Sequence, residues 1–387
     1  MRQRTWIPIV ALSAALAACR DARSSGSSTV TLIPSTAGAN GCAGPNQVFT
    51  APQTPTTVAL STWIVGASSQ ITAAAGSELV YATGASGQIV ALDFDSGSLV
   101  ETELVGGTTI QTLTGVAADL SGIAVLDAQT LLVIDRGSHT IVAVDRITPD
   151  TVAAFAGLAG AGPGFASGLA SGARFNFSAP TQICPTGGTP RRVLVADVGN
   201  HAIRVLDEVD PTNDIWLVDT LAGFGTPGFE DGDLADASFD TPNGLSVACN
   251  GTLIVSEHGD FGAGQRLRQL EVGSPSPFSG FLGTSTTLVG TGVDDTLDDL
   301  AGVPQVSQPE APLVTSGGDV YWIDSGSGVL RRRLAAGAVD CPLAIDCATA
   351  VGAPTFPAGH AFSLTLTDGG VLYVLDATDG VLYRVTP

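Results

Sequence analysis

The chain has 387 residues, with 44% hydrophobic and 14% charged side chains and 48 glycines. This apolar content excludes a largely disordered protein, because disordered chains lack the hydrophobic residues that form a core. The formal net charge of −21 excludes nucleic acid as a partner, because an acidic surface repels phosphate groups. Frequent glycine between short apolar runs predicts an all-β fold that is rich in turns.

The first segment of the chain has the pattern of an export signal. Arg2 and Arg4 precede an apolar run over residues 6–15, and Leu-Ala-Ala-Cys follows, ending at Cys19. A positive start, a short apolar stretch and small residues at its end are typical of signal peptides. The stretch is too short to span a bilayer. We therefore predict a signal peptide over residues 1–18.

Residues 19–56 are rich in Ser, Thr, Gly, Pro and Ala. A segment of this composition buries too little apolar surface to order itself. We expect a flexible tether here, with Cys42 as an unassigned cysteine.

From residue 57 to residue 387 one pattern recurs six times. A β-rich apolar run ends in a polar residue, a glycine-containing turn follows, and a second β-rich run comes next. The polar residues that end the first runs are Thr83, Asp135, Asp197, Glu257, Asp324 and Asp376. Units of roughly 50–70 residues with several strands each are typical of propeller blades. The sequence therefore predicts a six-bladed β-propeller of four-stranded antiparallel blades.

The ends of this repeat region predict how the ring closes. The last unit stops after its third strand, and an additional β-rich run at about residues 57–64 precedes the first complete unit. Pairing these segments removes an exposed sheet edge, which is otherwise an aggregation hazard. We expect the N-terminal strand to complete the last blade.

The third unit carries the most specific motif of the chain. From the second residue after Asp197 it reads Gly-Asn-His-x-Ile-Arg, which corresponds to Gly199, Asn200, His201, Ile203 and Arg204. The second unit keeps part of this motif, with His139 in the place of His201. The pattern resembles the NHL-repeat family. The N-terminal Leu-Ala-Ala-Cys is similar to the lipobox of bacterial lipoproteins, and an ordinary secretory signal that happens to contain a cysteine is the alternative.

Each resemblance implies roles for particular residues. The NHL resemblance implies an NHL-type propeller over residues 57–387 and a structural repeat role for Asp135, His139, Asp197, Gly199, Asn200, His201, Ile203, Arg204, Glu257, Asp324 and Asp376. The lipobox resemblance implies cleavage before Cys19 and lipid attachment to it, with an acyl group such as palmitate. The chain would then be anchored in the bacterial cell envelope, on the periplasmic or outer face of a membrane.

Other residues with ligating or redox chemistry give weaker signals. Cys341 and Cys347 bracket a short loop, and export permits a disulfide between them; Cys184 and Cys249 are a second candidate pair. The acidic segments 230–236 and 294–299 offer oxygen ligands for calcium, with solvated surface loops as the alternative reading. We predict no catalytic residue and no cofactor, and a metal site stays open.

Two functions are compatible with these features. The first is a lipid-anchored binding or scaffold module for a protein, peptide or glycan ligand. The second is a metal-dependent enzyme with its site at the central channel, because six-bladed relatives include calcium-dependent lactonases and a zinc-dependent peptidyl-hydroxyglycine lyase. A shared fold is weak evidence for a shared activity, so we favour the binding module. The oligomeric state is left open.

Overall fold

The computed structural model describes residues 33–34, 55–60, 66–74, 78–94, 99–187, 190–248, 250–259, 264–276, 280–292, 305–343 and 355–386. The predicted signal peptide and Cys19, most of the predicted tether, Cys42, Cys249, Cys347 and the acidic segment 294–299 lie outside these ranges. Within the described ranges, no helix has the length and apolarity needed to cross a membrane.

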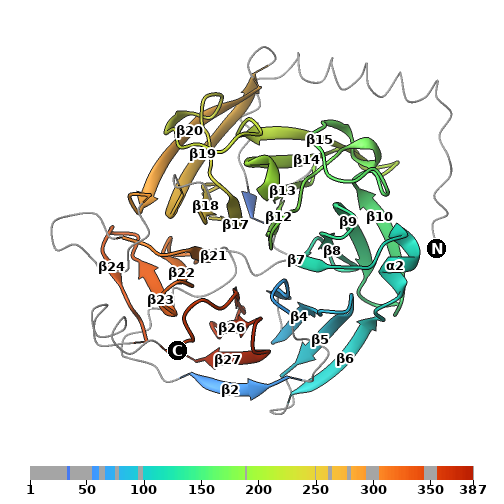
Figure 1. The fold of residues 1–387 in the computed structure, drawn as a ribbon, viewed down its shortest axis with the longest axis horizontal. Helices are drawn as coiled ribbons and strands as arrows, with labels where there is room; N and C mark the ends of the chain where they lie inside the picture. Colours follow the sequence, from blue (N-terminus) through green and yellow to red (C-terminus); the bar gives the residue numbers. More distant parts are fainter. Residues whose placement is uncertain are drawn as a thin grey trace.

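Six small antiparallel sheets form a ring around a central axis (Figure 1). The first blade contains β3 (Ile71–Ala73), β4 (Leu79–Thr83), β5 (Ile89–Asp93) and β6 (Val100–Val105). The second contains β7 (Leu120–Val125), β8 (Thr130–Asp135), β9 (Thr140–Asp145) and β10 (Val152–Ala156). The third contains β12 (Ile183–Gly187), β13 (Arg192–Asp197), β14 (Ala202–Asp210) and β15 (Ile215–Ala222).

The remaining blades follow the same order from the axis outwards. The fourth contains β17 (Pro242–Val247), β18 (Leu253–Glu257), β19 (Arg266–Ser276) and β20 (Gly280–Val289). The fifth contains β21 (Pro309–Val314), β22 (Val320–Asp324), β23 (Val329–Arg333) and β24 (Val339–Asp340). The sixth contains β25 (Phe362–Leu366), β26 (Leu372–Asp376), β27 (Val381–Val385) and, from the other end of the chain, β2 (Thr56–Ala59). The predicted six-bladed all-β fold is confirmed.

The predicted ring closure is confirmed as well. β2 pairs antiparallel with β27, with Thr56 opposite Arg384 and Ala59 opposite Val381. The two strands lie side by side at the rim (Figure 1). The last blade therefore has no exposed third strand, because the segment before the first unit supplies its outer edge.

Short elements add to the four-stranded plan. β11 (Gly168–Leu169) and β16 (Gly232–Asp233) pair with the outer strands of the third and fourth blades. β1 (Ile33–Pro34) lies within the predicted tether and pairs with β12. The only described helices are α2 (Thr109–Thr114) and the 3-10 turns η1 (Ala170–Gly172) and η2 (Val198–Asn200). The sequence did not predict these additions, because each pairs through main-chain atoms over two residues.

The core consists of apolar clusters between neighbouring blades. In β8, Leu131 and Val133 pack with the first blade, whereas Leu132 and Ile134 pack with the third. Successive side chains of a strand point to opposite faces, so both faces of this strand are covered. This explains why the second strand of each blade is nearly continuous in apolar residues.

Candidate functional site

The polar residues that end the second strands are buried carboxylates in five of the six blades. Asp135, Asp197, Glu257, Asp324 and Asp376 are each 0% exposed. In the third, fourth and fifth blades an arginine on the next strand forms an ion pair with this carboxylate. The pairs are Asp197–Arg204 at 3.0 Å, Glu257–Arg268 at 2.8 Å and Asp324–Arg331 at 2.5 Å.

Two of these arginines also lie between phenylalanine rings. The guanidinium carbon of Arg204 is 4.8 Å from the ring centre of Phe165 and 5.3 Å from that of Phe175. Arg268 repeats this arrangement with Phe229 and Phe239. Contact with ring faces stabilises a desolvated cation. The sequence analysis missed these aromatic partners, although the two phenylalanines recur at matching places in both units.

The histidines of the second and third units connect blades. His139 and His201 adopt left-handed backbone conformations, with φ of 54° and 47°. The Nδ1 atom of His139 accepts a hydrogen bond from the N–H of Phe177 at 3.1 Å, and that of His201 accepts one from Thr241 at 3.2 Å. Each donor belongs to the next unit. Burial lowers the pKa of His139, which favours the neutral ring that an acceptor requires.

The other motif residues pack around the buried carboxylate. Asn200 donates from Nδ2 to Asp197 at 2.9 Å and to the carbonyl of Gly164 at 2.8 Å. A Cβ atom on Gly199 would lie 2.4 Å from the side chain of Asn176, so a larger residue there would displace that side chain. Ile203 is fully buried. These contacts hold the motif residues within the blade.

A different set of residues forms a cavity near the ring axis. We call it the axial cavity, and its volume is about 250 Å³. Its polar lining includes Gln70, Gln182, Asn243, His258 and Glu310, and Phe362 also lines it. These residues come from the first, third, fourth, fifth and sixth blades and, except for His258, lie at or just before the innermost strand of their blade.

Glu310 is the acidic group of the axial cavity. Its Oε2 accepts a hydrogen bond from the N–H of Phe362 at 2.9 Å. Burial raises the pKa of Glu310, whereas this hydrogen bond and the nearby His258 act in the opposite direction. The register of β21 shifts between Glu310 and Leu313, and Ala311 has a φ of 48°. Bulges of this kind redirect side chains, and this one lies at the cavity wall.

Asn243 and Gln182 form the amide part of the cavity wall. Asn243 lies at a second register shift, between Pro242 and Gly244. Its Oδ1 accepts from Ser256 at 2.7 Å. The Oε1 of Gln182 accepts from the N–H of Leu245 at 2.8 Å. These bonds fix Asn243 within the fourth blade and Gln182 against it. Within the described residues, the NH₂ groups of both amides donate no hydrogen bond.

The remaining candidates from the sequence take other roles. In the acidic segment 230–236, Asp231 accepts hydrogen bonds from Arg268 and from the N–H of Thr287, both at 2.9 Å. This carboxylate is therefore committed to holding the loop. Cys341 and Cys184 are buried, but their candidate partners Cys347 and Cys249 lie outside the described residues, so both pairings stay predictions.

Comparison with solved structures identifies the fold class of the chain, whereas comparison of its sequence finds no match. No protein-family model and no curated protein matches the chain. A gluconolactonase from Xanthomonas campestris is similar in structure, with a TM-score of 0.51 and 12% identity over 92% of this chain and 98% of that one. A streptogramin B lyase gives a TM-score of 0.49 and 12% identity over 86% and 97% of the two chains. An auxiliary nutrient-binding protein from Bacteroides thetaiotaomicron gives a TM-score of 0.49 and 9% identity over 92% and 76%.

Identities this low establish only a shared fold, and the chain is a six-bladed β-propeller. They assign no activity to its residues.

Proposed function

We propose that the axial cavity binds a small, uncharged, hydroxyl-rich ligand, such as a saccharide unit, and that the propeller is a ligand-binding module. The observation that carries this proposal is the convergence of two fixed amides and one partly buried carboxyl group on one cavity. Amide and carboxyl groups donate to and accept from hydroxyl groups.

The size of the cavity supports a small ligand. Its volume of about 250 Å³ is below the range of roughly 300–1,000 Å³ that is usual for drug-sized ligands. A folded protein does not enter a space of this size, although a single sugar unit at the end of a glycan does. Among the ligand types expected from the sequence, the glycan therefore fits this cavity best.

The envelope location is part of the same proposal. A lipid on Cys19, followed by the tether, would hold the propeller at a membrane surface, where extracellular saccharides are accessible. The support for this part is the lipobox-like sequence alone.

A second function is favoured by one specific feature of the cavity. His258 lies near Glu310, and burial raises the pKa of that carboxyl group. A carboxyl group with a raised pKa next to an imidazole is suited to general acid–base catalysis. The alternative is therefore a hydrolase or lyase, for which a sugar lactone is a suitable trial substrate.

Titration calorimetry with a panel of monosaccharides and sugar lactones tests both functions. We expect one or more sugars to bind and Glu310→Gln or His258→Gln to weaken that binding at least tenfold. The control is Gln111→Ala, which removes an exposed amide from α2, and it should bind as the unmodified chain does. Absence of binding across the panel, or equal binding by both cavity variants, would refute the proposal. Lactone hydrolysis that is lost in Glu310→Gln would establish the enzyme instead.

A further inference from the structure

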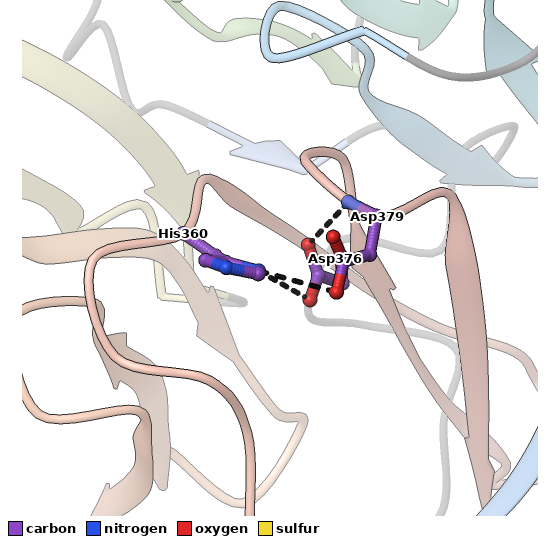
Figure 2. Close-up of side chains that lie close together, drawn as sticks. All are labelled: His360, Asp376 and Asp379. Carbon is purple, nitrogen blue, oxygen red and sulfur yellow. Dashed lines mark hydrogen bonds and ion pairs between the residues drawn. The ribbon is translucent and has the colours of Figure 1, made fainter.

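Three ligating side chains meet in the sixth blade. His360 lies just before β25, Asp376 ends β26, and Asp379 lies in the turn before β27. Figure 2 shows the imidazole facing both carboxylates. The Nδ1 atom of His360 is 2.9 Å from Asp376 Oδ2 and 3.9 Å from Asp379 Oδ2. One ligand atom from each residue lies within 4.8 Å of the others.

Comparison with the other blades shows what is different here. In the third and fifth blades, the buried carboxylate pairs with an arginine seven residues further along. Seven residues after Asp376 the chain has Tyr383. Among the described residues, the fully buried carboxylates of the second and sixth blades form no ion pair with arginine, and in the sixth blade an imidazole and a second carboxylate lie beside the buried one.

The carboxylate of Asp376 is also oriented for ligation. Its Oδ1 accepts hydrogen bonds from the main-chain N–H groups of Thr378 at 3.0 Å and Asp379 at 3.1 Å. These bonds hold Oδ2 towards His360. Hydrogen bonds that fix a ligating carboxylate in this way are a general feature of metal sites.

We propose that His360, Asp376 and Asp379 bind a divalent transition-metal ion of the zinc type. With zinc–ligand bonds of about 2.0–2.1 Å, tetrahedral ligand atoms are about 3.3 Å apart. The observed separations of 2.9 Å and 3.9 Å lie on either side of that value. One imidazole with two carboxylates favours zinc over calcium or magnesium, which prefer oxygen ligands alone.

The ion would supply the positive charge that arginine supplies in the third, fourth and fifth blades. It would have access from solvent, because the side chain of Asp379 is 56% exposed. Three protein ligands leave a fourth position for water or for a ligand group. The site does not depend on the axial cavity being functional, although Ala361 and Phe362, which follow His360, line that cavity.

Titration calorimetry of the metal-free full-length chain with zinc chloride tests this site. We expect one zinc ion to bind per chain, and Asp379→Asn to weaken that binding at least tenfold. Two variants serve as controls and should bind zinc as the unmodified chain does. Asp236→Asn removes an exposed carboxylate from the fourth blade, and His258→Gln alters the axial cavity alone.

Cobalt(II) provides a second readout that does not rely on heat. A bound cobalt ion with tetrahedral geometry gives intense visible absorption, and we expect this absorption to be lost in Asp379→Asn and His360→Gln. The proposal is overturned if the unmodified chain binds no zinc, or if Asp379→Asn binds it equally well. It is also overturned if binding is lost in His258→Gln, which would assign the ion to the axial cavity.

Discussion

Replacing Arg204 with methionine tests the physical role of the buried ion pairs. The guanidinium donates to Asp197 at 3.0 Å and to four further acceptors, which are Ala166 O, Ser167 Oγ, Arg174 O and Asp219 O. Burial lowers the pKa of Arg204 and raises that of Asp197. Burial therefore disfavours both charges, and the ion pair compensates for that cost. Arg204→Met leaves the carboxylate buried without its cation.

Removing one partner of a buried pair costs about 3–5 kcal/mol, and we expect Arg204→Met to lower the free energy of unfolding by this amount at pH 8. The loss should be smaller at pH 5. Without the arginine, the pKa of Asp197 in the folded state rises further above its unfolded value of about 3.9. The folded state then retains a proton that the unfolded state releases, so the variant loses stability as pH rises through that interval.

Guanidinium denaturation followed by tryptophan fluorescence measures both effects. Arg333→Met is the matched control, because Arg333 lies at the end of β23 and makes no ion pair among the described residues; its expected change is within about 0.5 kcal/mol. The double variant Asp197→Leu with Arg204→Met should recover more than half of the lost stability, because apolar replacements of a buried pair are often neutral. A loss below about 1 kcal/mol for Arg204→Met, or a larger loss at pH 5 than at pH 8, would refute the reasoning.

Three further predictions concern other parts of the ring. Burial raises the pKa of Glu257 from 4.5 to about 7, so the free energy of unfolding of the unmodified chain should fall between pH 4.5 and pH 7. Glu257→Gln should lack this pH dependence. Denaturant titrations that give the same pH dependence for both chains would contradict the prediction. His201→Ala should lower the free energy of unfolding by about 1–3 kcal/mol, because the N–H of Thr241 loses its acceptor. His201→Asn should lower it less, because asparagine tolerates a left-handed backbone. The reverse order of stability in thermal melts would be inconsistent with the inter-blade role. A chain that begins at residue 61 lacks β2, so the edge of β27 is exposed and we expect aggregation, which light scattering would detect. A monomer with an unchanged melting midpoint would argue against the closure as a stabilising feature.

The ring and its closure could be predicted from the sequence because both follow from short-range patterns. Apolar runs that end in Asp135, Asp197 or Asp376 indicate strands covered on both faces, and their recurrence gives the number of blades. The aromatic partners of Arg204 and Arg268 could also have been found, by aligning the third and fourth units with each other. The five-stranded and larger sheets could not, because β1, β11 and β16 pair through main-chain atoms whose positions depend on the folded loops.

The axial cavity was not predicted from the sequence, for a reason that applies to any propeller. Its polar residues are far apart in sequence, and Gln70, Gln182, Asn243 and Glu310 belong to four different units. A search for motifs within short windows treats each as an isolated polar residue. Each nevertheless lies at the start of an innermost strand, and the ring brings these positions together on one axis. Comparing that single position across all six units is therefore the sequence test that would reveal such a site, although the register shifts at Asn243 and Glu310 still decide which side chains enter it.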